Sequence, residues 1–154
     1  MWPVVVVLVL TGIAGIYELH AEQTKPPAAL VVSAETQTTW LVRYCDAIEG
    51  ALEASSPAGS GQLTVNFSGP LAAASTNFNN FYVGATRTVQ CWMTTPPAEV
   101  NQQVVSIGSG GSDTAGIAAS TTAWESSQMG VVGQSLIHSL PASEVGTIVV
   151  MSGY

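Results

Sequence analysis

The chain has 154 residues, of which 47% are apolar, and its mean hydropathy is +0.35. That length allows one domain, and that apolar content excludes disorder for the bulk of the chain. Three basic residues against ten acidic ones give a net charge of −7, which excludes a nucleic-acid-binding protein because a phosphate backbone would be repelled.

The first element is an apolar segment at the N-terminus. The residues from Trp2 to Tyr17 include no charged side chain, and charged residues begin at Glu18. As a helix these 16 residues would be about 24 Å long, somewhat short of the roughly 30 Å hydrocarbon core of a bilayer. We therefore expect residues 1–25 to form a membrane anchor and juxtamembrane segment, with lipid contacts from Trp2, Val4, Leu8, Leu10, Ile13, Ile16 and Tyr17. Small residues at Thr11, Gly12 and Gly15 would allow a second helix to approach closely.

A secretory signal peptide cleaved near residues 19–21 is the alternative interpretation of this segment. Such a signal normally begins with Lys or Arg, and no basic side chain precedes the apolar run here, which favours an uncleaved anchor. No later stretch of the sequence approaches spanning length. We therefore expect a single-pass protein whose residues 26–154 form one domain on one side of the membrane.

The domain begins at Pro26-Pro27, a pair that interrupts any helix continuing from the anchor. The sequence predicts a first helix over Ser33–Ser55, capped by Ser33 and ended by the following Ser-Pro. Apolar residues at helical spacing predict its buried stripe, namely Leu41, Cys45, Ile48 and Leu52.

The two cysteines, Cys45 and Cys91, are an even number behind an export segment, as expected of a disulfide in an oxidising compartment. A strand predicted over Thr86–Met93 places Cys91 on its single buried face with Val89 and Met93. A helix packed on that strand would bring the two sulfurs within bonding distance. In the chain-entropy model, the loop closed by such a disulfide would add about 4 kcal/mol to the stability of the fold. Two buried free cysteines, behaving as small hydrophobes, are the alternative.

Between the first helix and the Cys91 strand, the alternation of Leu63, Val65 and Phe67 predicts a short strand. Residues 71–84 are rich in Asn and Ala and have no clear period, so we expect a loop with at most one helical turn.

After the Cys91 strand, Thr95 is predicted to cap a second helix that buries Val100, Val104 and Ile107. A glycine-rich loop is expected over residues 108–113, followed by strands over 117–121 and 145–151. Because strands and helices do not alternate, we expect an α+β domain with two helices packed on one face of a mainly antiparallel sheet.

His138 is the one candidate for a catalytic base in the domain. Ser135 and Ser139 lie near it in the sequence, but the Gly-x-Ser-x-Gly motif is absent and serine is common throughout the chain. We favour a partly exposed loop or strand histidine, so we predict no catalytic residue and no enzyme.

Three carboxylates, Asp46, Glu49 and Glu53, follow one stripe of the first helix and could in principle hold a hard cation. A solvated helix face is the favoured interpretation, because the stripe lies off the apolar one and no acidic glycine loop accompanies it. Arg43 and Arg87 are expected to pair with nearby acids or with a partner. We therefore predict no metal site and no cofactor.

Two short pieces carry a resemblance to a known family. With the segments WLVRYCDAI at residues 40–48 and LPASEVGTIVV at residues 140–150, behind an N-terminal apolar segment, the sequence resembles the small PilM proteins of plasmid-type thin (type IVB) pili. The resemblance implies a cell-envelope component held in the inner membrane, within the pilin transport apparatus or the pilus basal body, and without enzymatic activity. It carries over no functional residue.

We therefore expect an inner-membrane-anchored periplasmic component of type IVB pilus assembly or pilin transport that docks to other pilus or envelope proteins, alone or as an oligomer. The content of charged residues, 8%, is typical of exported and surface proteins. A cleaved, secreted adhesive or binding module is the alternative, and a small hydrolase using His138 is a third class. A pilin is disfavoured because Glu18 ends the apolar segment instead of lying within it.

Overall fold

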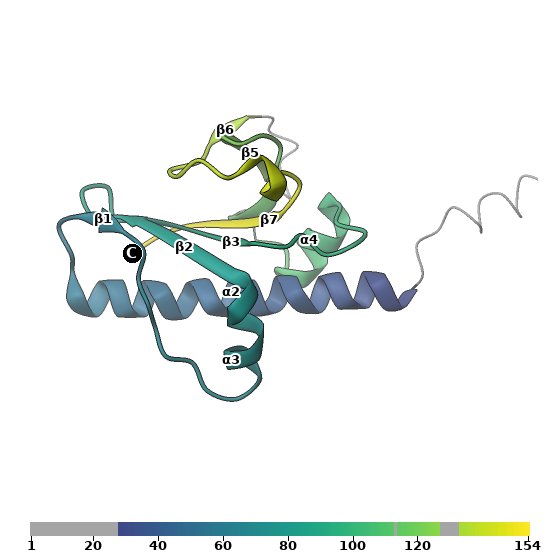
Figure 1. Cartoon of the computed structure of the whole chain (residues 1–154), viewed down its shortest axis with the longest axis horizontal. Helices are drawn as coiled ribbons and strands as arrows, with labels where there is room; N and C mark the ends of the chain where they lie inside the picture. The colour runs from purple at the N-terminus through teal and green to yellow at the C-terminus, as the bar shows by residue number, and fades with distance from the viewer. Residues whose placement is uncertain (1–27, 113, 127–132) are drawn as a thin grey trace, which may run out of the picture.

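A computed structural model describes residues 28–112, 114–126 and 133–154 of the chain. Its long helix α2 (Ala28–Ser55) lies along one face of a curled, seven-stranded sheet in which every strand pair is antiparallel (Figure 1). Helix α4 (Gln102–Gly108) lies against α2 and strand β4. The predicted α+β class with an antiparallel sheet is confirmed.

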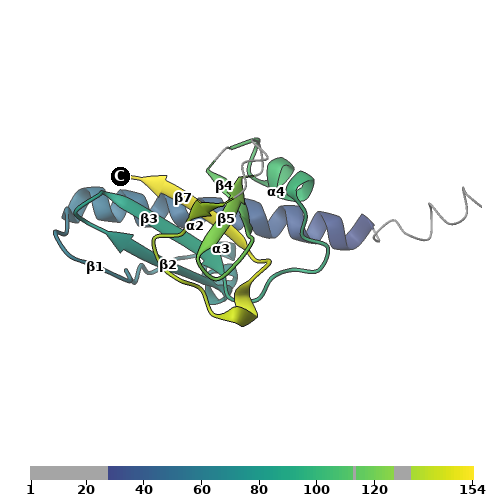
Figure 2. The same ribbon diagram turned by 90° about the horizontal axis from the view of Figure 1, so that it is seen from above.

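The sheet follows the order β1-β2-β3-β7-β4-β5-β6, so the last strand of the chain lies in the middle (Figure 2). The short helix α3 and the 3₁₀ turn η1 precede β2, and the 3₁₀ turn η2 precedes β7. The bounds of these elements are β1 Ser60–Gly61, α3 Pro70–Ala74, η1 Ser75–Asn77, β2 Phe78–Val83, β3 Thr88–Met93, β4 Ala115–Ala118, β5 Ala123–Ser126, β6 Gln134–Ser135, η2 Ala142–Glu144 and β7 Ile148–Gly153.

Helix α2 ends at Ser55 as predicted, but it begins at Ala28, directly after the proline pair, and not at Ser33. The Ser33 hydroxyl accepts a hydrogen bond from the side chain of Gln37 (3.3 Å) instead of capping a helix start. Ser33 therefore lies inside the helix, five residues after Ala28.

The main core lies between α2 and the sheet. Leu41, Cys45, Ile48 and Leu52 are all 0% exposed, which confirms the predicted stripe. They pack with residues of the central strands and of α4, namely Phe78, Val89, Met93, Val105, Ala115, Ile148 and Val150. Cys45 and Cys91 form the predicted disulfide, with their Cα atoms 5.8 Å apart.

Strand β3 was predicted to bury one face, and the structure buries both. Val89, Cys91 and Met93 belong to the core under α2, whereas Gln90 and Trp92 are buried on the opposite face. A second, smaller cluster forms there from Trp92, Ala118, Leu140 and Val149, with Phe81, Leu136 and Met151 packed against it. The fold thus covers both sides of the sheet.

Two predictions upstream of β3 are wrong. Residues 63–67 do not form a ladder strand, although their exposure alternates as expected, with Leu63, Val65 and Phe67 half-buried. The stretch 71–84 has the expected helical turn, which is α3 and begins at Pro70, but it also contains η1 and the whole of strand β2, which were expected to be loop. The asparagines of β2 masked its pattern, because Asn is depleted in strands.

The second helix begins at Gln102 and not at Thr95. Asn101 caps it, since its side chain accepts a hydrogen bond from the N–H of Val104 (3.0 Å). Val104 is buried as predicted, but Ile107 is 55% exposed and Val105 is fully buried instead. Val100, the third residue of the predicted stripe, lies before the start of the helix.

The strands near the C-terminus are shorter or more numerous than predicted. The expected strand at 117–121 is β4, which begins and ends earlier, and β5 and β6 were not predicted. The expected strand at 145–151 begins only at Ile148, because Gly146 has a φ of +88° and its N–H donates to the carbonyl of Ala118 (2.8 Å). That left-handed conformation, which favours glycine, forms a turn before the strand.

The predicted anchor and helix-association residues lie outside the described residues; they are Trp2, Val4, Leu8, Leu10, Ile13, Ile16 and Tyr17, and Thr11, Gly12 and Gly15. Asp113 of the expected glycine-rich loop also lies outside them. Among the helices in the described part of the chain, none combines the length and the apolar character needed to cross a membrane.

Candidate functional site

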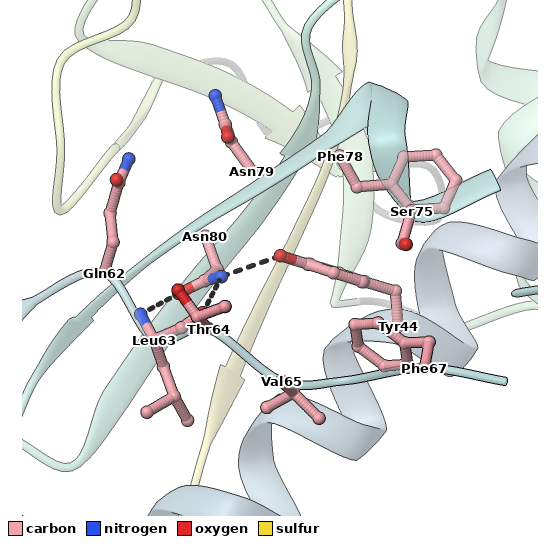
Figure 3. Close-up of a pocket in the computed structure, with 10 residues that line it drawn as sticks. All are labelled: Tyr44, Gln62, Leu63, Thr64, Val65, Phe67, Ser75, Phe78, Asn79 and Asn80. Carbon is pink, nitrogen blue, oxygen red and sulfur yellow. Dashed lines mark hydrogen bonds between the residues drawn. The ribbon is translucent and has the colours of Figure 1, made fainter. Parts of the chain in front are cut away.

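A cavity of about 220 Å³ opens between strand β2 and the extended segment at residues 62–67 (Figure 3). We call it the Tyr44 cavity, after the side chain that reaches it from α2. No charged side chain lines it. The lining residues are Tyr44, Gln62, Leu63, Thr64, Val65, Phe67, Ser75, Phe78, Asn79 and Asn80.

The cavity exists because the chain leaves the sheet after β1. The register of β1 with β2 sets Gly61 opposite Tyr82, and its continuation would set Leu63 opposite Asn80. The Asn80 side chain intervenes: its Oδ1 accepts from the Leu63 N–H (2.8 Å) and its Nδ2 donates to the Leu63 carbonyl (2.8 Å) (Figure 3). The amide thus replaces a main-chain pair and holds the segment away from β2.

Tyr44 forms the aromatic floor of the cavity with two phenylalanines. Its ring centroid lies 5.1 Å from that of Phe67 and 5.4 Å from that of Phe78, and the latter contact is edge-to-face. The Tyr44 hydroxyl oxygen accepts a hydrogen bond from Asn80 Nδ2 (2.7 Å). Burial raises the pKa of Tyr44 above its usual 10.0, against the opposing effect of that hydrogen bond, so the phenol stays protonated at neutral pH.

His138 lies in the loop between β6 and η2, half-buried, as the favoured interpretation had it. Its ring stacks on Phe81, with centroids 4.4 Å apart, and lies 5.7 Å from the ring of Trp92. Its ring nitrogens make no hydrogen bond within the described part of the chain. The arrangement packs the His138 ring against the aromatic residues of the sheet.

The acidic stripe runs along α2, with Asp46 and Glu53 exposed and Glu49 half-buried. Burial is the largest cause that raises the pKa of Glu49; the neighbouring charges of Asp46 and Glu53 raise it further, and a hydrogen bond with Ser152 lowers it. Among the described residues, no three side chains of His, Cys, Asp or Glu are grouped to hold a metal ion. The absence of a metal site in the whole chain stays a prediction.

The two arginines of the domain lie over aromatic rings. The Arg43 guanidinium carbon is 5.2 Å from the ring centroid of Trp40, and that of Arg87 is 5.7 Å from the ring of Tyr154. Such cation–π contacts are compatible with binding to a partner, because the charge stays hydrated on one side.

Sequence reasoning missed Asn80 and Gln90, the two side chains that fix the loops beside the sheet. Gln90 repeats the geometry of Asn80 on the opposite face: its Oε1 accepts from the His138 N–H (3.0 Å) and its Nε2 donates to the His138 carbonyl (3.1 Å). The sequence offered one signal for them, namely an amide side chain within a strand. Such a side chain, when buried, must find hydrogen-bond partners. The partners themselves are distant in sequence.

No family model matches the sequence, and no curated protein matches it. Among solved structures, the fold is similar to the crystal structure of a protein named PilM from Escherichia coli B7A. The similarity covers 84% of this chain and 98% of that chain, with a TM-score of 0.51 and 16% sequence identity. At that identity, the likeness shows that the two chains share a fold.

Proposed function

We propose that this chain is an inner-membrane-anchored periplasmic component of a type IVB pilus assembly or pilin transport apparatus, and that it acts by docking to other proteins. The fold similarity to a protein named PilM carries the proposal. It gains weight because the sequence itself resembles PilM proteins at two separate pieces of the chain.

The disulfide supports a periplasmic location for the domain. Cys45 and Cys91 are the only cysteines of the chain, and they are bonded to each other inside the core. Disulfides of this structural kind persist in oxidising compartments and are rare in the bacterial cytosol. The apolar residues 2–17 supply the proposed tether to the inner membrane.

The side chains of the domain support docking over catalysis. Its one histidine packs against Phe81 and Trp92, and the Tyr44 cavity is lined by neutral residues without an acid–base pair. We propose no substrate, metal or cofactor. Binding to other pilus or envelope proteins is the function that remains, and an oligomer is compatible with it.

Deletion of the gene in the strain that carries it tests the proposal. We expect pili to disappear from the cell surface while the pilin subunit is still made, and a plasmid copy to restore them. Immunoblotting of pilin and electron microscopy of cells separate these two outcomes. Normal piliation of the deletion strain would contradict the proposal.

N-terminal sequencing of the mature protein distinguishes the anchored component from a secreted binding module. We expect Met1 to be retained on protein recovered from membranes. A mature chain that begins near Glu22 and is recovered from the soluble fraction would favour the secreted module instead.

A further inference from the structure

One border of the sheet is formed by β1 and the extended segment that follows it, residues 60–68. β1 is the first strand in the sheet order, so no strand of the described part of the chain lies beyond it (Figure 2). The Gly84 N–H donates to the carbonyl of Gly59, and the main chain of Leu63 bonds to the Asn80 side chain. Because bonding direction alternates along an extended chain, the main-chain groups of the intervening even-numbered residues point away from β2.

The main-chain groups that point outward are free. Those of Gln62, Thr64 and Asn66 make no hydrogen bond with any residue that the structure describes. The side chains of these three residues are exposed as well, whereas the odd-numbered residues between them pack against the main core. An edge with free N–H and C=O groups is a template for pairing with another extended chain.

This edge lacks the side chains that usually protect an edge from pairing. Charged residues and proline are the common protection. No charged residue occurs from position 54 to position 86, the longest uncharged stretch of the chain, and no proline lies between Pro57 and Pro70. Two copies that met along this edge would therefore bring no like charges together within the pairing strands, although the whole protein carries −7.

The sequence of the edge is complementary to itself. In an antiparallel pair centred on Thr64, the Thr64 side chains of the two copies lie opposite each other, and Gln62 of one copy lies opposite Asn66 of the other. On the other face of the ribbon, the same register sets Leu63 of one copy opposite Val65 of the other. Polar residues thus meet polar ones on the exposed face, and apolar residues meet apolar ones beside the core.

We propose that two copies of this chain pair edge to edge through residues 60–68, in the antiparallel register centred on Thr64, and form one continuous sheet across a two-fold axis. A two-fold axis closes an interface in which a surface meets itself. The proposal goes beyond the proposed function, because it names a second copy as a docking partner and requires no other pilus protein. The contact is smaller than a standard interface of about 20–30 residues a side, so we expect a dimer that depends on protein concentration.

Disulfide cross-linking of the full-length chain in membranes of the producing cells tests the register. Paired residues of antiparallel strands have Cα atoms about 4.5–5.5 Å apart, which a disulfide can span. Thr64→Cys should therefore form a covalent dimer under mild oxidation, and so should a mixture of Gln62→Cys and Asn66→Cys chains. Gln62→Cys alone should form none, because the register places its two copies about 13 Å apart along the ribbon.

Two controls accompany the cross-linking. Thr86→Cys, exposed in the turn between β2 and β3, reports random collision, and the wild-type chain reports exchange of the native disulfide. Both should give at most one tenth of the dimer formed by Thr64→Cys. Absence of a Thr64→Cys dimer, an equal amount from Thr86→Cys, or a dimer of Gln62→Cys alone would overturn the proposal.

Charges at the two-fold axis test the pairing without added cysteines. Thr64→Lys sets two like charges opposite each other, so the detergent-solubilised full-length protein should dimerise at least tenfold more weakly in analytical ultracentrifugation. Thr86→Lys, the matched control, should stay within twofold of wild type. A mixture of Thr64→Lys and Thr64→Glu chains should recover the dimer, and both variants should fold because Thr64 is exposed. Unchanged dimerisation of Thr64→Lys, or a mixture no better than either variant alone, would overturn the proposal.

The outcomes separate this inference from the proposed function. A failure of pairing removes the dimer, while the deletion strain still reports on the pilus role. Pairing of a protein whose deletion leaves pili intact removes the pilus role and keeps the dimer.

Discussion

The two faces of the sheet are stabilised in different ways. The face under α2 buries a large apolar cluster and carries the only disulfide, so its stability comes from buried area and one covalent bond. The opposite face buries a cluster of four apolar residues, and individual polar contacts hold its cover in place. Gln90 binds the main chain of His138 there, and the Trp92 N–H donates to a Glu144 carboxylate oxygen (2.7 Å).

This difference shows how one small domain covers both sides of a sheet. A helix offers a continuous apolar stripe, so many side chains contribute and each is replaceable in part. A loop offers few apolar residues and many main-chain groups, so the hydrogen bonds of a single side-chain amide can hold it against the sheet. We therefore expect the first face to respond to loss of volume and the second to loss of hydrogen bonds.

The largest effect is expected from the disulfide. Replacement of Cys45 and Cys91 together by Ala should lower the free energy of unfolding by about 4 kcal/mol, because the unfolded chain regains the freedom of a long loop. Urea unfolding followed by circular dichroism measures this, and the reduced wild-type protein is the control. A loss below about 1 kcal/mol would show that the α2 face does not depend on the covalent bond.

Core truncations compare the two faces directly. Ile48→Ala, under α2, should cost about 4 kcal/mol, and Leu140→Ala, on the opposite face, about 2 kcal/mol, because the smaller cluster can relax or admit water. Urea midpoints with unchanged slopes would establish both values. Equal losses would contradict the distinction between the faces.

Loss of the Gln90 amide should affect the second face through hydrogen bonds alone. Gln90→Met keeps the length of the side chain and removes both bonds to His138, so we expect a loss of about 1.5 kcal/mol in unfolding free energy. Gln103→Met, on the exposed side of α4, is the matched control and should change stability by less than about 0.5 kcal/mol. Faster hydrogen exchange at the His138 amide should accompany the loss.

The smallest effect concerns Glu49. Its pKa is raised in the folded protein, so the corresponding stability is fully present below the unfolded pKa, near 4.5, and is lost as pH rises through the folded pKa. Glu49→Gln should therefore raise the unfolding free energy at pH 7, since it removes a half-buried charge and two like-charge contacts on the helix. Solvent screening keeps the gain to about 0.5 kcal/mol, and we expect no gain at pH 3. Glu35→Gln is the control, and a destabilised Glu49→Gln variant at pH 7 would contradict this electrostatic account.

The sequence predicts the elements whose burial follows a simple period. Helix α2 and strand β3 were found because Leu41, Cys45 and Ile48 repeat at helical spacing and Val89, Cys91 and Met93 alternate. Their disulfide followed from the same two patterns. Burial of Gln90 and Trp92 was missed, because the loop that covers them is far away in the sequence.

The candidate site could be predicted only in part. The alternation of Leu63, Val65 and Phe67 correctly indicated which side chains face inward, but a strand also needs a neighbour with free main-chain groups. The side chain of Asn80 takes the place of that neighbour, and no local pattern reports such a bond between residues 17 positions apart. The cavity is therefore a product of the tertiary fold.

The most direct test of the whole account is the state of the two thiols in living cells. Cells that produce the chain are quenched in acid, denatured, and treated with a maleimide mass tag before or after reduction. The account predicts no tag before reduction and two tags afterwards, because the domain folds in an oxidising space with Cys45 bonded to Cys91. Two tags without reduction would contradict it.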